Sequence, residues 1–345
     1  MEVVELRGRM YRDLEKRSVM MFQRILVPLD GSSRAERALA VAARVARVSG
    51  GSILLLQVVS PPIDYGGGLA QAPFLTEQVI ETELAVASGY LDRVAKAREL
   101  TGIETTTEVL FGLPAQVILA EAESQSVDLI IMCSHGRTGF TRWVLGSVAQ
   151  KVVRQSPVPV FVLRAGEPVP AASHADAAYP ISALVALDGS SLAEVALVPA
   201  ANLVAALAAP RKGALHLMQV IKPLATTADE GFITQLNEEA VEGAKAYLVA
   251  VKERLQETLK NLKLSITWSV ALYADAADAI ISTAEREEDE EGAQGFAGCD
   301  LIAMSTHGRA GLERWVMGSV TECILGATKL PLLVVRPEKV MEGQE

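Results

Sequence analysis

Short apolar runs alternate with amphipathic segments along most of the chain. Residues 24–30 form a run rich in β-branched side chains, which is typical of a strand buried on both faces. Residues 32–50 then show helical periodicity between a serine and a glycine, which predicts a helix. In the rest of the first half we expect strands at 52–60, 104–110, 127–134 and 157–164 and helices at 76–101, 114–124 and 147–155, the first of these helices with Leu84, Leu91 and Val94 on one face.

The second half of the chain repeats this order of elements, from a strand at 182–188 to one at 331–337. The clearest repeat is "SHGRTGFTRWVLGSV" at 134–148, which returns as "THGRAGLERWVMGSV" at 306–320. Self-similarity over such a length is not a chance event and marks a repeated structural unit. The chain is therefore predicted to be a doubled unit.

The strand pattern predicts the fold class. Apolar strands separated by helices indicate a parallel sheet covered on both sides, and right-handed crossovers then give a doubly wound sandwich. Pro157, Pro159 and Pro331 lack the N–H group of a ladder donor, so we expect the last strand of each half at a sheet edge. The prediction is an α/β protein with two tandem, doubly wound, five-stranded parallel-sheet domains.

Changes in composition mark the domain boundaries. A stretch rich in Pro, Ala and small polar residues separates the halves, and an acidic, then glycine-rich stretch of the second half is typical of a surface loop. The expected organisation is an N-terminal extension at 1–20, a first domain at 21–164, a linker at 165–180, a second domain at 181–337 with an acidic insert at 286–298, and a C-terminal tail at 338–345.

Composition narrows the class of protein. The 345 residues suit two domains, and half of them are apolar, which is enough for a core in each. The net charge of −10 argues against a nucleic-acid partner, which would need clustered Lys and Arg. The three cysteines have no metal or disulfide spacing, which suits a reducing cytoplasm. The longest apolar run, at 193–209, is interrupted by polar residues and proline, so we expect a buried helix and no membrane partner.

Candidate chemistry gathers where the strands end. In an open parallel sheet, ligands bind beyond the carboxyl ends of the strands, where the strand order reverses. "LDGSS" follows the first strand of each half, at 29–33 and 187–191, and a glycine-rich loop follows the fourth. Asp30 and Asp188 stand in these turns, where a carboxylate can accept from an amine or a ribose hydroxyl, or can cap the next helix.

The glycine loops are candidate phosphate sites. In the first half Gly136, Gly139 and Gly146 lie between a strand and a helix that begins near Ser147, with Arg137 to supply charge. Glycines let backbone N–H groups approach an anion and adopt positive φ, and a helix N-terminus adds donors and dipole. A glycine-rich turn with a serine N-cap is the alternative. The same arrangement recurs in the second half at Gly308, Arg309, Gly311, Gly318 and Ser319.

Other side chains near these loops allow two interpretations each. His135 and His307 lie in the loops and are interpreted as bonding to the backbone rather than as catalytic, because no serine or cysteine is placed to form a triad. Trp143 is interpreted as a packing anchor rather than an adenine-stacking ring, and Cys133 as a buried filler rather than a reactive thiol. The chain has neither a Walker phosphate loop nor a G-x-G-x-x-G turn.

In these motifs both halves resemble the universal stress protein family, from about Phe22 to Pro337. The ATP-binding subgroup of that family carries G-2x-G-9x-G-[ST] after the fourth strand, an aspartate after the first and a valine late in the second. The matching positions are Asp30, Val58, Met132, Gly136, Gly146 and Ser147 in one half and Asp188, Val220, Met304, Gly308, Gly318 and Ser319 in the other. Their neighbours complete the implied nucleotide sites, namely Pro28, Leu29, His135, Arg137 and Val148, and Ala186, Leu187, His307, Arg309 and Val320.

One position departs from the family pattern. The first glycine of the motif is Cys133 in one half and Ser305 in the other. If that position needs positive φ or close approach of the ligand, the side chain costs about 1 kcal/mol or more in strain and weakens nucleotide binding.

The resemblance implies a cytoplasmic stress-response or signalling protein that binds ATP, or ADP or AMP, at one site per domain. Mg²⁺ would arrive only with the nucleotide, and neither catalytic nor metal-ligating residues are predicted. The resemblance also implies that domains pair through their last strands, which gives an internal pseudo-dimer of the two halves, with a homodimer beyond it. A slow ATPase or phosphoryl-transfer enzyme and a nucleotide-free interaction protein remain as alternatives.

Overall fold

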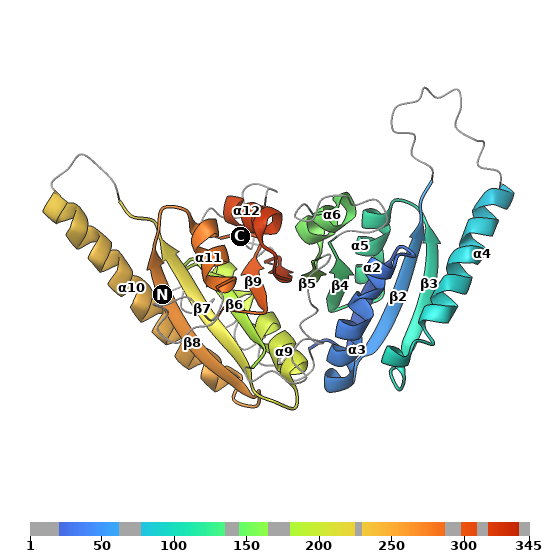
Figure 1. Cartoon of the computed structure of the whole chain (residues 1–345), viewed down its shortest axis with the longest axis horizontal. Coiled ribbons are helices and arrows are strands. Elements are labelled where there is room, and N and C mark those ends of the chain that lie inside the picture. The colour runs from blue at the N-terminus through green and yellow to red at the C-terminus, as the bar shows by residue number, and fades with distance from the viewer. Residues whose placement is uncertain are drawn as a thin grey trace, which may run out of the picture. The chain divides into compact units, whose positions relative to one another are not determined.

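The computed structural model describes residues 21–61, 77–134, 145–164, 180–224, 230–286, 298–308 and 317–337. They fall into two compact units, the first within Phe22–Val169 and the second within Pro170–Glu345. Each unit is an α/β layer structure around its own parallel sheet (Figure 1). The N-terminal extension, residues 165–179 of the linker, residues 287–297 of the acidic insert and the C-terminal tail lie outside the described residues.

The first unit has a five-stranded parallel sheet with the strand order β3-β2-β1-β4-β5. Its strands are β1 (Arg24–Leu29), β2 (Ser52–Val59), β3 (Thr105–Phe111), β4 (Leu129–Cys133) and β5 (Val160–Leu163). Its helices are α2 (Ser33–Glu36), α3 (Ala38–Ser49), α4 (Glu77–Val94), the 3₁₀ turn η1 (Arg98–Leu100), α5 (Pro114–Ser124) and α6 (Ser147–Gln155).

The second unit repeats this topology with the order β8-β7-β6-β9-β10. Its strands are β6 (Ser182–Leu187), β7 (Gly213–Ile221), β8 (Leu264–Leu272), β9 (Leu301–Ser305) and β10 (Leu332–Val335). Its helices are α8 (Ser191–Glu194), α9 (Leu197–Ala208), α10 (Glu230–Thr258), α11 (Ala276–Ala284) and α12 (Ser319–Ala327). The predicted doubly wound fold is confirmed in both halves.

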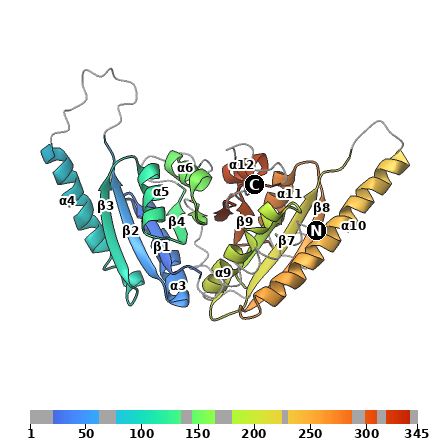
Figure 2. The ribbon, with the colours of Figure 1, turned by 180° about the vertical axis from the view of Figure 1, so that it is seen from behind.

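Helices cover both faces of each sheet. Because parallel crossovers are right-handed, α3 and α4 lie on one face of the first sheet and α5 and α6 on the other. In the second unit α9 lies along β6 and β7 (Figure 2). This cover explains why every residue of β4 and β9 is buried, whereas the outermost strand β3 is mostly polar and partly exposed.

Among the described residues, one segment, Ser191–Ala208, has the length and composition of a membrane span. It comprises α8 and α9, and 72% of it is buried inside the protein. Its apolar character therefore serves the core of the second unit, as the interrupting polar residues predict.

Two expectations about elements are wrong in detail. The helix expected at 76–101 ends at Val94, and η1 follows, because the chain turns to bury Leu100 beside α3. Leu84 is only half-buried, and Ala87 takes its place in the core. The prolines expected within the last strands precede them, so that Pro159 only accepts a hydrogen bond, through its carbonyl oxygen, from the Ile130 N–H.

Candidate functional site

A cavity of about 1120 Å³ opens at the carboxyl ends of the first unit's strands. It lies where β1 has β2 on one side and β4 on the other, which is the point where the strand order reverses. The ends of these three strands form its floor, and residues of α4, α5 and the first turn of α6 form its walls. The cavity is therefore at the position expected for a ligand site in this fold.

The described residues of the first predicted nucleotide site meet at this cavity. Those that line it are Pro28, Leu29, Asp30, Val58, Met132, Gly146, Ser147 and Val148. His135, Gly136 and Arg137 lie outside the described residues, as does Arg309 of the second half. The sequence motif and the fold thus select the same place independently.

Asp30 holds the turn between β1 and α2. Its Oδ1 accepts hydrogen bonds from the N–H of Ser32 at 3.0 Å and from the Ser32 hydroxyl at 2.6 Å. The Ser32 oxygen in turn accepts from the N–H of Ala35 at 3.2 Å, which caps α2. Asp30 is thus not the helix cap, and the capping interpretation of the sequence is wrong. The aspartate instead orients the serine that caps.

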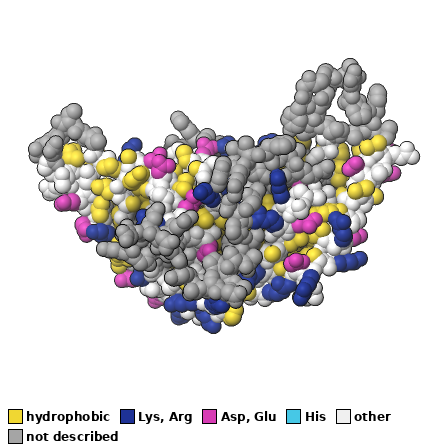
Figure 3. All heavy atoms as spheres, viewed as in Figure 1, with side chains coloured by type: hydrophobic (Ala, Val, Ile, Leu, Met, Phe, Trp, Pro, Cys, Tyr) yellow, Lys and Arg dark blue, Asp and Glu magenta, His cyan; other side chains and the backbone are white. Residues whose placement is uncertain are grey.

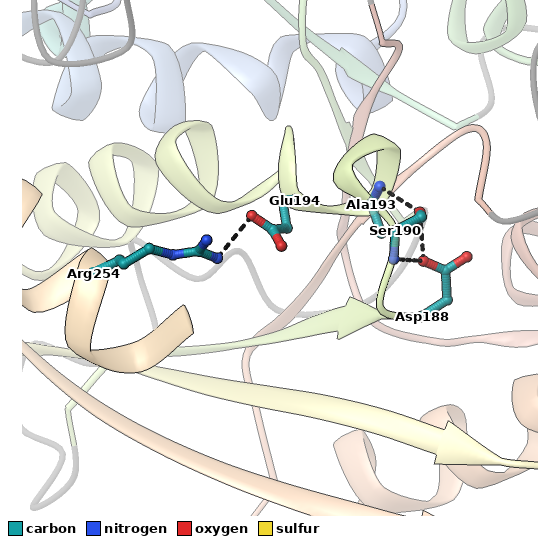
Figure 4. Close-up of polar contacts among 5 residues, drawn as sticks. All are labelled: Asp188, Ser190, Ala193, Glu194 and Arg254. Carbon is teal, nitrogen blue, oxygen red and sulfur yellow. Dashed lines mark hydrogen bonds and ion pairs between the residues drawn. The ribbon is translucent and has the colours of Figure 1, made fainter. Parts of the chain in front are cut away.

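The second unit repeats this network (Figure 4). Oδ1 of Asp188 accepts from the N–H and hydroxyl of Ser190 at 2.9 and 2.6 Å, and the Ser190 oxygen accepts from the Ala193 N–H at 3.2 Å. The agreement of these distances with those of the first unit shows that both turns are built in the same way. Each turn holds a carboxylate at the carboxyl end of the first strand of its unit.

The start of α6 presents backbone donors to the cavity. Gly146 is the N-cap residue, with φ −61°, and its N–H donates to the Ser134 carbonyl at 2.8 Å. Ser147 is therefore the first helical residue and not the cap. The N–H groups of Ser147, Val148 and Ala149 begin the helix and have no acceptor within it, and all three residues line the cavity. This geometry suits an anion.

The start of α12 matches it in the second unit. Gly318 is the N-cap residue with φ −60°, and its N–H donates to the Thr306 carbonyl at 2.9 Å. Neither Gly318 nor Gly146 has the positive φ that the glycine pattern led us to expect. Backbone freedom is thus not the reason why these two positions are glycine.

Gly308 has a different reason to be glycine. A Cβ at this position would collide with Oδ2 of Asp188. The loop after β9 therefore packs directly on the carboxylate that holds the turn after β6. The sequence suggested that this glycine makes room for a ligand, and the structure shows that it makes room for Asp188.

The two residues that depart from the family pattern are the last residues of their strands. Cys133 ends β4 and Ser305 ends β9, so both have extended backbone and the expected strain from positive φ does not arise. The Cys133 thiol lies 2.8 Å from the Arg34 carbonyl oxygen, and burial raises its pKa to about 11. A neutral, buried thiol is what the filler interpretation predicts.

Ser305 and His307 form a local network in the second unit. The Ser305 oxygen accepts from the His307 N–H at 3.3 Å, and Nδ1 of His307 lies 2.8 Å from the Thr306 hydroxyl. His307 thus bonds to its own loop, in line with a structural role. Met304 is buried at the base of this loop.

The long helix α4 also contributes side chains to the cavity, and no sequence motif marks them. Tyr90 and Arg93 of α4 line the cavity, with the Arg93 guanidinium 5.5 Å from the centre of the Tyr90 ring. Burial raises the pKa of the Tyr90 phenol, and the nearby carboxylates of Glu36 and Asp30 raise it further. The phenol therefore stays neutral and can donate a hydrogen bond.

In the second unit an ion pair joins the long helix to the short one. Nη2 of Arg254 lies 3.0 Å from Oε2 of Glu194, whose side chain is fully buried (Figure 4). Glu36 and Glu194 occupy equivalent positions, just before α3 and α9. Glu36 lies near Tyr90 of α4 in the first unit, whereas Glu194 pairs with Arg254 of α10 in the second. The two units share a topology but differ in the contact between the long helix and this glutamate.

Two glutamines were also missed. Gln57 on β2 and Gln219 on β7 lie among mostly apolar residues at the same register position, opposite Leu29 and Leu187. A polar residue repeated at one place in two buried strands was the signal that the sequence offered. Among the described residues there is no group of three side chains of the metal-ligating kind.

Comparison with known proteins identifies relatives of both halves. The profile of the Universal stress protein family matches residues 21–164 and again residues 182–336. A universal stress protein of Thermus aquaticus is 37% identical over 145 residues, which cover 42% of this chain and all of that protein. Universal stress protein Rv2005c of Mycobacterium tuberculosis is 26% identical over 252 residues, or 70% of this chain and 74% of the relative.

A solved structure shares the fold over nearly the whole chain. The crystal structure of a universal stress protein from Archaeoglobus fulgidus covers 91% of this chain and 98% of its own, with a TM-score of 0.59 and 21% sequence identity. Two copies of one domain thus account for the architecture described above.

Proposed function

Because this chain belongs to the universal stress protein family, we propose that it binds ATP or another adenine nucleotide at one site per domain. The nucleotide would lie at the carboxyl edge of each sheet, and its binding would serve a stress-response signal. No catalytic residue is part of the proposal. Any Mg²⁺ would be held mainly by the phosphates, because the described residues offer no metal cluster.

The observation that carries the proposal is the polarity of the first unit's cavity. One end carries the exposed N–H groups at the start of α6, which suit phosphate oxygens. The other end carries the Asp30 carboxylate, which can accept from a ribose hydroxyl or an exocyclic amine. A ligand with an anionic end and a donor-bearing end fits both, and a nucleotide has both.

The second unit supports a second site of the same kind. Asp188, Gly318 and Ser319 repeat the backbone geometry of their counterparts, as the matching distances and dihedral angles show. Ala186 and Leu187 are buried at the end of β6, and Val220 follows on β7. Val320 occupies the second position of α12, as Val148 does in α6.

Isothermal titration calorimetry of the whole chain with ATP and Mg²⁺ tests the proposal. We expect binding heat with a stoichiometry of two ATP per chain. ADP and AMP should bind with an affinity equal to that of ATP or weaker. The matched variant is Gly146→Val with Gly318→Val, which places a side chain at both helix starts and should abolish most of the heat. Absence of any heat with the unmodified chain at millimolar nucleotide would contradict the proposal.

Location and assembly belong to the proposal as well. All three cysteines are free thiols, which supports a reducing cytoplasm. The net charge of −10 supports a small nucleotide rather than a nucleic acid as the ligand. On the face that Figure 3 shows, charged side chains of both signs lie among hydrophobic ones. Light scattering of the whole chain during size-exclusion chromatography tests the homodimer, and mixing the two halves as separate fragments tests their pairing.

A further inference from the structure

Gln57 and Gln219 present buried carbonyl oxygens that the fold leaves unsatisfied. Oε1 of each side chain is inaccessible to solvent and finds no hydrogen-bond partner among the described residues. Gln219 is only 3% exposed. A buried, unpaired acceptor lowers the stability of a folded protein, and most buried polar groups therefore have partners. An unpaired acceptor repeated in both units calls for a function.

Packing does not explain a glutamine at these positions. The neighbouring residues of β2 and β7 are mostly aliphatic, and Leu56 and Met218 beside the two glutamines are almost fully buried. A methionine or leucine would fill the same space without an unpaired oxygen. The polar atom itself must therefore be what the position uses.

The register places each glutamine at the carboxyl edge of the sheet, next to the strand end that leads to the aspartate of its unit. Gln57 lies opposite Leu29, one residue before Asp30, and Gln219 lies opposite Leu187, one residue before Asp188. Gln57 and Asp30 both line the cavity, so both residues border the part of it where β1 and β2 end. The backbone donors of α6 stand on the β4 side, because α6 follows β4.

The nature of the acceptor decides what it can bind. Phosphate oxygens are acceptors themselves, so they pair with the N–H groups of α6 and not with a glutamine carbonyl. The donors of a nucleotide are the N–H groups of its base and the hydroxyls of its ribose. A glutamine oxygen that meets the ligand therefore pairs with its nucleoside end.

We propose that Gln57 and Gln219 select the nucleoside, each by turning its side-chain amide so that Oε1 accepts one hydrogen bond from a base N–H or a ribose O–H. The inference rests on the proposed nucleotide site and adds a residue that distinguishes one nucleoside from another. A site that hydrogen-bonds a ligand group discriminates strongly against an analogue without it, because its own polar atom is then left unpaired.

The first part of the test is calorimetry of the unmodified chain with ATP, ITP, 2′-deoxy-ATP and 3′-deoxy-ATP. ITP lacks the exocyclic amine, and each deoxy analogue lacks one hydroxyl. We expect the analogue without the donor that reaches the glutamine to bind about tenfold or more weakly than ATP. Equal affinity for all four ligands would overturn the inference.

The second part uses the chain with Gln57→Met and Gln219→Met, which keeps side-chain size and removes the acceptor. We expect ATP to bind this variant about as weakly as the discriminated analogue binds the unmodified chain. ATP and that analogue should then bind the variant with equal affinity. Affinity for inorganic triphosphate should not change. Gln155→Met, at the far end of α6 from the cavity, is the matched control and should behave as the unmodified chain.

The outcomes separate this inference from the function on which it rests. If the unmodified chain binds no ATP, both fail. If it binds ATP and the methionine variant binds ATP equally well, the glutamine oxygen does not meet the ligand and only the inference fails. We also expect the ligand-free variant to melt at the same temperature as the unmodified chain or above it, since an unpaired acceptor has been removed. A lower melting temperature with equal losses for every ligand would show a structural role and overturn the inference.

Discussion

At the scale of single residues, glycines that look alike in the sequence have different roles. Gly308 is needed because the Asp188 carboxylate occupies the space where a Cβ would lie. A Cβ on Gly318 would come no closer than 3.4 Å to its nearest neighbour, the Thr306 carbonyl oxygen, which the fold tolerates. Gly308 thus serves packing, whereas Gly318 keeps the helix start open.

Substitution by alanine should separate these roles. Gly308→Ala should lower the free energy of unfolding by about 2 kcal/mol, because the methyl group and the carboxylate cannot both keep their places. Gly318→Ala should lower it by less than about 1 kcal/mol but should weaken ATP binding at the second site. Urea denaturation and calorimetry measure the two effects. Equal stability of the two variants would contradict this assignment.

At the scale of elements, buried polar contacts tie β8 and α10 to the rest of the second unit. The ring of His216 on β7 lies between the hydroxyls of Thr267 and Ser269 on β8, at 2.8 and 2.7 Å. Arg254 of α10 reaches the buried Glu194 at the end of α8. These contacts make the stability of outlying elements depend on charge states inside the unit.

His216 should make the second unit sensitive to acid. Burial lowers its pKa from 6.5 to about 4, so the folded unit favours the neutral ring. This contribution to stability is complete above about pH 6.5 and is lost as the pH falls from there through 4, by about 3 kcal/mol in all.

His216→Gln keeps both hydroxyl contacts and removes the titration. Urea denaturation at pH 7.5 and pH 4.5 should show a smaller acid loss for this variant than for the unmodified chain. Other titrating groups act equally in both proteins, so the difference between them isolates His216. Parallel losses in the two proteins would rule out this effect.

The ion pair of α10 should be costly to break from one side. Arg254→Met leaves the Glu194 carboxylate buried without this partner, and we expect the unfolding free energy to fall by about 3 kcal/mol. Lys245 on the same helix pairs with Glu242 at 2.7 Å on the surface, so Lys245→Met should cost no more than about 0.5 kcal/mol. Glu194→Gln added to Arg254→Met should restore part of the loss. Similar melting temperatures for the two single variants would refute the comparison.

At the scale of the whole molecule, the chain is two repeats of one α/β architecture. Each unit has its own buried sheet, its own helices on both faces and its own site geometry. The Thermus relative, matched over its full length by 42% of this chain, shows that one such domain makes a whole protein. Each half should therefore fold without the other.

Separate expression of residues 21–164 and 180–337 tests this independence. Each fragment should unfold cooperatively in urea, because each keeps a complete core, and each should bind one ATP. Association of the fragments on mixing, measured by light scattering, tests the proposed pairing of the halves. A fragment without a cooperative transition would contradict independent folding.

The sequence by itself determined the doubling, the parallel doubly wound fold and the place of the candidate site. These features depend on local patterns, namely apolar strands, amphipathic helices and glycine-serine turns, which the chain carries twice. The predicted helix at 147–155 coincides with α6 for this reason.

Only the tertiary structure decided which side chains meet. That Asp188 packs on Gly308, that Arg254 reaches Glu194 and that Gln57 and Asp30 line one cavity depend on strand order and register. These contacts join residues far apart in the chain, and local sequence patterns are the same whether or not the contacts form. The physical reason is that long-range pairing is set by how whole elements pack, and the pattern within one element does not encode its partner.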